Sequence, residues 1–411
     1  MPSMPLSRDL RLLCVIALLY ITQGIPMGLA MEALPTLLRR DGAPLSALAF
    51  LPLVGIPWII KFLWAPWVDN HWSPRLGKRR SWILPMQVVI VACLLAAALV
   101  GFEAAGSRIA IALFTLASLA SATQDTATDG LAVENFSGPM LARANAVQVG
   151  GTMVGFFLGG GGFLIISGLF GRMAGMVGLA GIVAMALLLA ALWHEPQAPR
   201  EQARESASLK RFLRRRGAVR ILALALLVAM SASATFGLFK LLLVDRGWSM
   251  EAIGLVGTTG GAVTILIGCG GGAWLLNRVG LRSLLTVAGV CLVVSAATWM
   301  LIASSVVALS MPLVLVAVVA GSIGSGAGSM GAMTWAMNFA SQSHQAGTDM
   351  TAVQSMRDTG EIGAGVAGTA LAASLGYGIA FIMPVILALF LVLVVVTRSK
   401  DVSDVRIPRS G

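Results

Sequence analysis

The chain has 411 residues, of which 57% are hydrophobic and only 11% charged, and its mean hydropathy is +0.87. This composition excludes an ordinary water-soluble enzyme, and the net charge of +11 does not indicate a nucleic-acid partner. The charged residues gather in short clusters between apolar stretches of roughly 20 residues, the length with which a helix crosses a ~30 Å hydrocarbon core. The sequence therefore predicts an all-α membrane protein whose surroundings are the lipid bilayer.

Twelve apolar stretches are long enough to span the membrane, and each should be helical because lipid offers the backbone no hydrogen-bonding partner. The stretches lie near residues 11–31, 46–66, 81–101, 108–131, 144–168, 173–193, 219–243, 251–276, 283–303, 308–336, 350–373 and 377–397. Most of the 29 basic residues fall on one side of the membrane when the N-terminus is placed inside. The positive-inside rule then predicts that both termini lie in the cytoplasm.

A long polar segment at residues 194–218 divides the predicted spans into six and six. Residues 40–48 resemble residues 245–253, and the Ala-Val-Gln of residues 146–148 recurs at 352–354, so both matches have nearly the same offset. Such a pattern favours a parallel duplication of a six-helix unit. The predicted domains are an N-terminal bundle at 1–193, a cytoplasmic central loop at 194–218, and a C-terminal bundle with a short tail at 219–411.

Two corresponding links carry a related basic pattern. The link after the second span, residues 69–80, and the link after the eighth, residues 277–282, both resemble the D-R-x-G-R-R loop of the major facilitator superfamily. An ordinary positive-inside loop is the alternative explanation for either one alone. With the duplication, the resemblance implies the major facilitator fold of two pseudo-symmetric six-helix bundles. It also implies a gating role for four residues: Asp69, Arg79, Arg80 and Arg278.

Glycines spaced four residues apart mark one face of the fifth span. Gly151, Gly155 and Gly159 would let another helix backbone approach closely. In the superfamily that the chain resembles, the fifth and eighth spans face each other, and the eighth span carries Gly257 and Gly261 with the same spacing. Tight static packing is the explanation for most such motifs; the alternative is a sliding surface between the fifth and eighth spans.

A lysine inside the second span is the first candidate for handling cargo. An ionisable side chain within a span costs about 2.5–3.5 kcal/mol on insertion scales, so it needs a reason. Lys61 lies between Trp58 and Trp64 at helical spacing, and a cation beside indole rings suits an anionic or aromatic ligand. The alternative is a lysine that extends to the cytoplasmic interface.

The fourth span carries two aspartates one helical turn apart. Asp125 and Asp129 share a face, and their mutual repulsion favours protonation of one of them near neutral pH, as a proton carrier requires. Asp129 has the alternative of an interface or loop-clamping charge. Gln23 and Gln124 add uncharged hydrogen-bonding groups to the same half.

Charged residues also occur in spans of the second half. Lys240 can counter an acidic substrate or a distant carboxylate, or it marks the outer membrane interface. Arg357 and Glu361 are four residues apart, so they can neutralise each other; an ion pair with the other half is the alternative.

The sequence offers no pattern for catalysis or metal binding. Its three histidines fall in predicted links, its four cysteines form no CxxC pair, and a phosphate-binding loop of the GxxxxGK[ST] kind is missing. We therefore predict no cofactor, no metal site and no enzymatic activity. An ion gradient is the expected energy source, and a monomer the expected state.

Several segments resemble one branch of the superfamily more specifically. They are residues 20–26, 33–40, 61–69, 77–83 and 122–125. The set is similar to AmpG-type muropeptide permeases, to acetyl-CoA transporters and, more closely, to RhtX/FptX siderophore permeases. The chain also ends soon after its twelfth span, whereas AmpG-like permeases are longer. This resemblance implies import of a ferric siderophore of pyochelin type across the bacterial inner membrane. The alternatives are a permease for muropeptides or another amphipathic metabolite and, in another class, a membrane-embedded enzyme or sensor.

Overall fold

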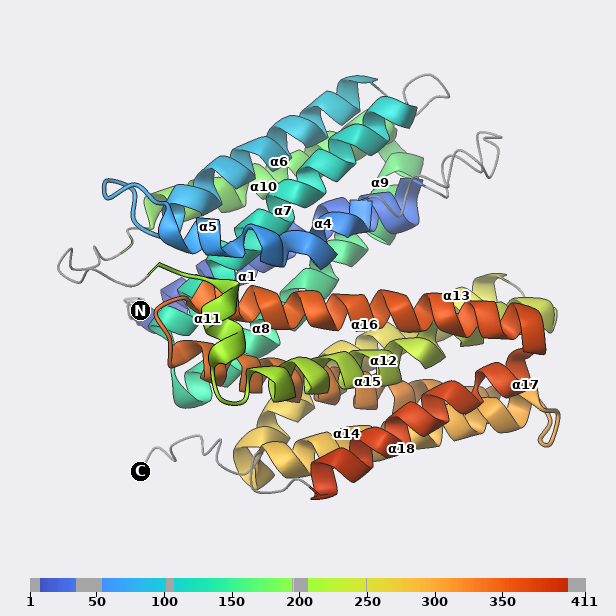
Figure 1. Ribbon diagram of the computed structural model, residues 1–411. Coiled ribbons are helices and arrows are strands. Elements are labelled where there is room, and N and C mark those ends of the chain that lie inside the picture. Colours follow the sequence, from blue (N-terminus) through green and yellow to red (C-terminus); the bar gives the residue numbers. More distant parts are fainter. Residues whose placement is uncertain are drawn as a thin grey trace, which may run out of the picture. The chain divides into compact units, whose positions relative to one another are not determined.

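Helices make up nearly all of the computed structural model, which describes residues 8–34, 54–100, 107–193, 195, 206–248 and 250–397 (Figure 1). The first half contains α1 Arg8–Gly28, the π-helical turn η1 Leu29–Ala33, α4 Ile56–Ile60, the 3-10 turn η3 Lys61–Leu63, α5 Ala65–Asn70, α6 Arg80–Val100, α7 Ser107–Asn135, α8 Gly138–Phe157, the π-helical turn η4 Leu158–Gly162, α9 Phe163–Phe170 and α10 Arg172–Leu192. The second half contains α11 Leu209–Arg214, α12 Ala218–Asp245, α13 Met250–Val263, the π-helical turn η5 Thr264–Gly271, α14 Gly272–Ala303, α15 Met311–Ser341, α16 Ala346–Leu375, α17 Tyr377–Ala380 and α18 Ile382–Thr397.

Each of the twelve predicted spans overlaps helix in the described residues. Eight helical stretches there are long and apolar enough to cross a membrane. Two further predicted spans correspond to α7 and α16, which are long but carry charged side chains. The last two correspond to α4–η3–α5 and to α13–η5, which are broken or locally distorted. The prediction of an all-helical membrane protein is confirmed.

The second predicted span is interrupted rather than continuous. Pro57 stands in the first turn of α4 and Pro66 in the first turn of α5, where the missing backbone N–H costs no helical hydrogen bond. Between them lies the short turn η3, which begins at Lys61. The prolines thus place the buried lysine at a break between two short helices.

The described helices fall into two compact units. The first takes its residues from Met1–Phe136, Val147–Phe212 and Ala340–Ala352, and the second from Ser137–Ala146, Leu213–Phe339 and Val353–Gly411. Helices α8 and α16 therefore contribute to both units. The predicted division into residues 1–193, 194–218 and 219–411 stays a prediction.

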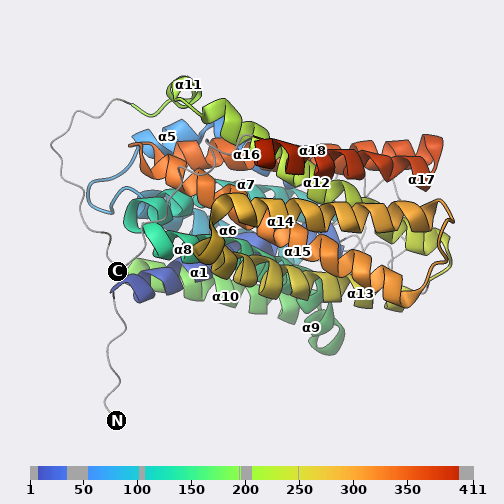
Figure 2. The ribbon, with the colours of Figure 1, turned by 90° about the horizontal axis from the view of Figure 1, so that it is seen from below.

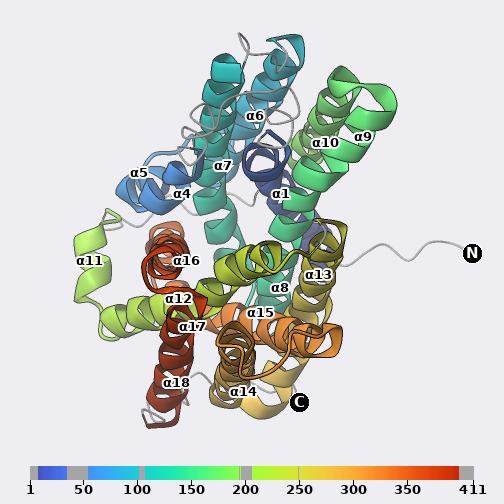
Figure 3. The same ribbon diagram turned by 90° about the vertical axis from the view of Figure 1, so that its right-hand side faces the viewer.

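Each unit has its own apolar core. In the first, α1, α6, α7 and α10 lie side by side (Figure 3) and bury Ile25, Leu94, Phe114 and Val183. In the second, α12 and α14 pack along α18, and α15 packs on α14 (Figure 2). The Trp299 ring stacks on Phe239 with centroids 5.2 Å apart and on Phe381 at 6.3 Å. Burial of such large rings is a major stabilising contribution in a helical core.

The glycine face of α8 packs tightly on α1, as static packing of such a face predicts; a sliding contact with the eighth span stays a prediction. A Cβ atom built on Gly155 would lie only 1.9 Å from the Ile21 carbonyl oxygen, and one on Gly24 of α1 would lie 2.1 Å from the Thr152 carbonyl oxygen. Gly268, in the eighth predicted span, lies against Gly326 of α15. The reason is that α1 carries its own glycines four residues apart, Gly24 and Gly28, and two such faces fit backbone against backbone.

Candidate functional site

A buried ion pair joins the second and fourth predicted spans within the first unit. Lys61 Nζ binds the Asp125 carboxylate, and the two side chains are only 1% and 4% exposed. Burying two charges is costly, and the cost is recovered only when both partners are present. Lys61 is therefore an internal residue of this unit, and the alternative of a lysine extending to the interface is wrong.

The two tryptophans flanking Lys61 have different environments. The Trp58 ring lies 4.7 Å from Lys61 Nζ, as expected for a cation beside an indole. Trp64 instead donates its Nε1 hydrogen to Thr123 Oγ1 at 3.1 Å. With Trp67 and Trp82 it lines an apolar cavity of about 310 Å³. The change of helix geometry at η3 explains the difference, because the regular spacing that the sequence suggested does not continue through the turn.

The second aspartate of α7 has separate partners. Asp129 is fully buried, and its Oδ1 accepts hydrogen bonds from Tyr20 Oη and Gln148 Nε2, both at 2.7 Å. It therefore connects α7 with α1 and α8, so the alternative of an interface or loop-clamping charge is wrong. Lys61 is thus a partner of Asp125, whereas Asp129 Oδ1 accepts from two neutral donors; the expected protonation of one of the two aspartates near neutral pH stays a prediction.

Buried amides line the contact between α1, α7 and α8. Gln23 Nε2 donates to Thr128 Oγ1 at 3.2 Å, and Gln124 Nε2 donates to the Leu19 carbonyl oxygen at 3.4 Å. The Oε1 atoms of Gln23, Gln124 and Gln148 accept no hydrogen bond from any described residue. A buried polar atom usually has a partner, so these oxygens offer hydrogen-bond acceptors to water or to a polar ligand.

The link after the second predicted span forms a buried charge network. Arg79 is 1% exposed; its Nη1 donates to Asp69 Oδ1 at 2.6 Å, while Nε and Nη2 bind both carboxylate oxygens of Glu134 at 2.9 and 2.7 Å. Lys78 Nζ donates to Glu134 Oε1 at 2.8 Å. A two-point contact between a guanidinium and a carboxylate fixes geometry as well as charge.

The charges in this network set one another's protonation. Burial alone would raise the pKa of Glu134, but Arg79 and Lys78 outweigh burial and lower that pKa to about 2. Burial opposes the charge on Arg79, yet Glu134 and Asp69 raise its pKa above the ordinary value. Burial and the adjacent Arg79 lower the pKa of Lys78. Glu134 therefore stays ionised at neutral pH as the counterion of the loop.

Asp69, which binds Arg79, also binds the start of α16. Asp69 Oδ2 accepts the backbone N–H and the hydroxyl of Thr348, both at 2.7 Å. A Cβ atom on Gly347 would lie 2.9 Å from Asp69 Oδ1 and from Arg79 Nη1, so only glycine permits this approach. The backbone N–H groups at the start of a helix have no partner within the helix, which makes a carboxylate favourable there.

Glu195, which follows α10, binds the last residues of the basic link 69–80. Glu195 accepts the backbone N–H of Arg79 at 2.9 and 3.1 Å and that of Arg80 at 3.0 Å, at the start of α6. The Arg80 side chain donates to the Ala191 carbonyl oxygen at 2.6 Å. Burial raises the pKa of Glu195, and the backbone hydrogen bonds only partly offset that effect.

Two amide side chains hold the far end of the predicted central loop. Asn70 exchanges two hydrogen bonds with the Ala207 backbone, at 2.6 and 3.0 Å. Gln345 does the same with the Ser208 backbone, at 2.9 and 3.2 Å. The predicted loop is therefore fixed at Glu195 and again at residues 207–208; the intervening residues 196–205 lie outside the described part.

The sequence reasoning overlooked Glu134, Glu195, Thr348 and Tyr20. Glu134 follows the fourth predicted span in Val133-Glu134-Asn135, and Glu195 follows the sixth in Glu195-Pro196. An acid directly after an apolar stretch, opposite a basic loop, was the available signal.

Among the residues that the structure describes, no comparable network is found at the second copy of the loop, residues 277–282. Arg278 is exposed on α14, where its guanidinium carbon lies 5.4 Å from the centroid of Trp274. Asn277 stands where the first copy has Asp69, so Arg278 has no acid at the corresponding position. The gating role of Arg278 stays a prediction.

The charged residues of the second unit that the sequence suggested for transport lie on α12 and α16. The Lys240 and Glu361 side chains are exposed. Arg357 binds the adjacent Asp358, with Nη2 and Nε at 2.7 and 3.0 Å from Oδ1. Their roles in transport stay predictions. Among the described residues, no group of three or more His, Cys, Asp or Glu side chains is placed to hold a metal ion.

We expect the stabilising contribution of Glu134 to disappear in acid. Its ordinary pKa of 4.5 falls to about 2 in the folded protein, so the unfolded chain takes up the proton first. The contribution is complete above the ordinary pKa and is lost as pH falls through the folded value. Thermal unfolding of wild type and Glu134→Gln should show a gap in Tm at about pH 7 that narrows toward about pH 3. A gap independent of pH would contradict the ion-pair assignment.

Comparison with known proteins gives one family match and several relatives. The family described as Acetyl-coenzyme A transporter 1 matches residues 12–169. The anhydromuropeptide permease of Escherichia coli is 28% identical over 291 residues, covering 67% of this chain and 57% of that protein. The chain thus spans little more than half the length of this relative.

Solved structures match over almost the whole chain. The human organic anion transporter MFSD10 has a TM-score of 0.71 at 16% identity, and the match extends over 94% of this chain and 99% of that transporter. A bacterial homologue of the iron transporter ferroportin, in an outward-facing state, has a TM-score of 0.69 at 16% identity, with coverages of 95% and 99%. The proton:xylose symporter XylE of the major facilitator superfamily has a TM-score of 0.68 at 10% identity, over 95% of this chain and 96% of the symporter. The chain therefore has the major facilitator fold.

Proposed function

We propose that the protein is a secondary transporter of the bacterial inner membrane that moves an amphipathic, hydrogen-bonding metabolite, driven by a proton gradient. The single observation that carries the proposal is the buried Lys61–Asp125 ion pair among apolar helices. Charges inside a membrane protein are costly and usually serve the passage of ions or substrate. The anhydromuropeptide permease, the organic anion transporter MFSD10 and the symporter XylE, to which the chain is similar, support the same class of function.

The ion pair suggests how proton movement and cargo are coupled. Protonation of Asp125 removes the counterion of Lys61, so an anionic group of the cargo can take its place beside the Trp58 ring. Loss of the proton restores the ion pair and expels the anion. Asp129, held by Tyr20 and Gln148, lies one helical turn farther along α7 and positions that helix against α1 and α8.

We propose an anhydromuropeptide-like molecule as cargo. The similarity to the anhydromuropeptide permease extends over 67% of the chain, and this supports a muropeptide more than a siderophore. Such a molecule combines acidic groups with many hydrogen-bond donors. The Lys61 ammonium suits the acidic groups of the cargo. The cargo's hydrogen-bond donors suit the buried amide oxygens of Gln23, Gln124 and Gln148.

A ferric siderophore of pyochelin type is the second candidate. The observation in its favour is the indole of Trp58 beside the Lys61 ammonium, which suits an aromatic anion. In this case the iron is part of the cargo and needs no ligand from the protein.

Uptake assays in cells that lack their own permeases test the proposal and separate the two cargoes. We expect cells that express the protein to accumulate radiolabelled anhydromuropeptide, and a protonophore to abolish accumulation. Cells with the empty vector are the control. Accumulation of radiolabelled iron as the siderophore complex, without muropeptide uptake, would favour the second candidate. Uptake of neither above the control would contradict both.

The orientation in the membrane has its own test. Reporter proteins fused to the N-terminus and to the C-terminus should both be found in the cytoplasm.

A further inference from the structure

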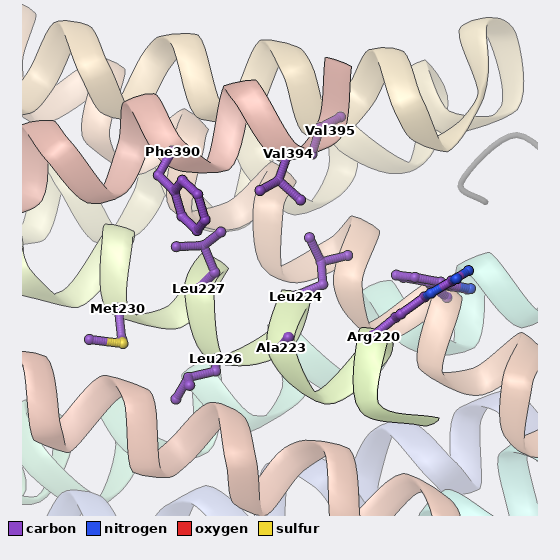
Figure 4. A pocket seen from close by; sticks show the side chains of 10 residues that line it. Arg220, Ala223, Leu224, Leu226, Leu227, Met230, Phe390, Val394 and Val395 are labelled. Carbon is purple, nitrogen blue, oxygen red and sulfur yellow. The ribbon is translucent and has the colours of Figure 1, made fainter. Parts of the chain in front are cut away.

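A second cavity lies within the second unit. It has a volume of about 400 Å³ and lies beside α12, α15 and α18. Figure 4 shows Phe390 and Val394 of α18 facing Leu224 and Leu227 of α12. None of the residues that the sequence suggested for transport lines this cavity.

The lining is apolar except at one end. Arg220 stands at one end of the lined stretch of α12 and Met230 at the other (Figure 4). Ten residues of helix separate them, which is about 15 Å at about 1.5 Å per residue. Phe390 is 53% exposed, so the cavity is a groove that opens toward the outside of the unit. In a helix that crosses the membrane, such an opening faces lipid.

The charged end of the groove belongs to a basic cluster, Arg214, Arg215, Arg216 and Arg220. Arg215 is fixed to α15, because its Nη2 donates to the Phe339 carbonyl oxygen at 2.6 Å and its guanidinium lies 3.8 Å from the Phe339 ring centroid. Arg214, Arg216 and Arg220 are exposed. A basic cluster at the end of a membrane helix attracts anionic headgroups.

We propose that this groove binds one anionic phospholipid of the bilayer. Its phosphate lies at Arg220, within the field of Arg214 and Arg216, and an acyl chain follows Leu224 and Leu227 toward Phe390. The occupant follows from charge and polarity together. A soluble anion matches the arginines but not the apolar wall, and a zwitterionic lipid matches the wall but adds no net charge.

Lipid binding to the purified full-length protein, followed by native mass spectrometry, tests the proposal. We expect phosphatidylglycerol to bind more tightly than phosphatidylcholine. Removal of one basic residue beside an anionic headgroup costs about 1 kcal/mol, so Arg220→Gln should weaken phosphatidylglycerol binding about fivefold and leave phosphatidylcholine unchanged. Arg220→Lys should retain the preference. The matched control is Arg246→Gln, which alters an exposed arginine just after the other end of α12.

A second variant tests the apolar part independently of charge. Ala223 lines the groove, and Ala223→Phe should fill it and weaken binding of both lipids, with an unchanged elution profile as evidence of folding. Added inorganic phosphate should not displace phosphatidylglycerol. The proposal is overturned if Arg220→Gln binds phosphatidylglycerol like wild type, if Ala223→Phe has no effect, or if phosphate competes fully, since the last result indicates a simple anion site.

Discussion

Replacement of Asp125 by Asn is expected to abolish proton-driven accumulation of substrate. The change removes the group that we propose takes up the proton, and it leaves Lys61 buried without this carboxylate as its counterion. Breaking a buried ion pair by removing one partner costs about 3–5 kcal/mol, so the variant should also unfold at a lower temperature. Uptake per molecule of membrane-inserted protein, quantified by immunoblot, measures the effect on transport separately from the loss of stability.

The double variant Lys61→Met/Asp125→Asn separates coupling from folding. Replacing both charges by neutral side chains of similar size removes the uncompensated ammonium, and buried pairs replaced in this way often lose no stability. We expect its Tm to return toward the wild-type value while accumulation stays absent. Wild-type accumulation in Asp125→Asn or in the double variant would exclude Asp125 as an essential proton carrier.

Replacement of Gly155 by Ala is expected to disrupt the first unit. The new Cβ atom would lie 1.9 Å from the Ile21 carbonyl oxygen, and backbone cannot move aside as a side-chain tip can. Helices α1 and α8 would have to separate, which weakens the hydrogen bonds of Tyr20 and Gln148 to Asp129. Overpacking of a close-packed interior costs about 1–3 kcal/mol and occasionally more. Thermal unfolding in detergent and the yield of monodisperse protein measure the loss.

Gly150 provides the matched control on the same helix. A Cβ atom there meets nothing within 4 Å, so Gly150→Ala should stabilise α8 by up to about 1 kcal/mol through its helix propensity. Opposite shifts in Tm for the two alanine variants support the close approach of α1 and α8. An unchanged Tm in Gly155→Ala would show that the backbones are farther apart.

The loop residues illustrate how far sequence reasoning reached into the site. The resemblance of residues 69–80 to a superfamily loop identified Asp69, Arg79 and Arg80, and the structure places these three in one region of the first unit. Their partners Glu134, Glu195 and Thr348 come from three distant segments. A local pattern identifies charges that need partners, but the partners depend on which helix ends lie together.

The sequence by itself determined that this is an all-helical membrane protein, because hydropathy and length depend only on neighbouring residues. It also identified Lys61 and Asp125 as charges within spans that need an explanation. Only the tertiary structure decided that these two residues bind each other and that Asp129 accepts hydrogen bonds from Tyr20 and Gln148. It also decided that the glycines of α8 meet α1. These choices depend on how each helix is rotated about its axis and which helix lies beside it. Packing between segments far apart in the chain sets both, since 64 residues separate Lys61 from Asp125 and 109 separate Tyr20 from Asp129.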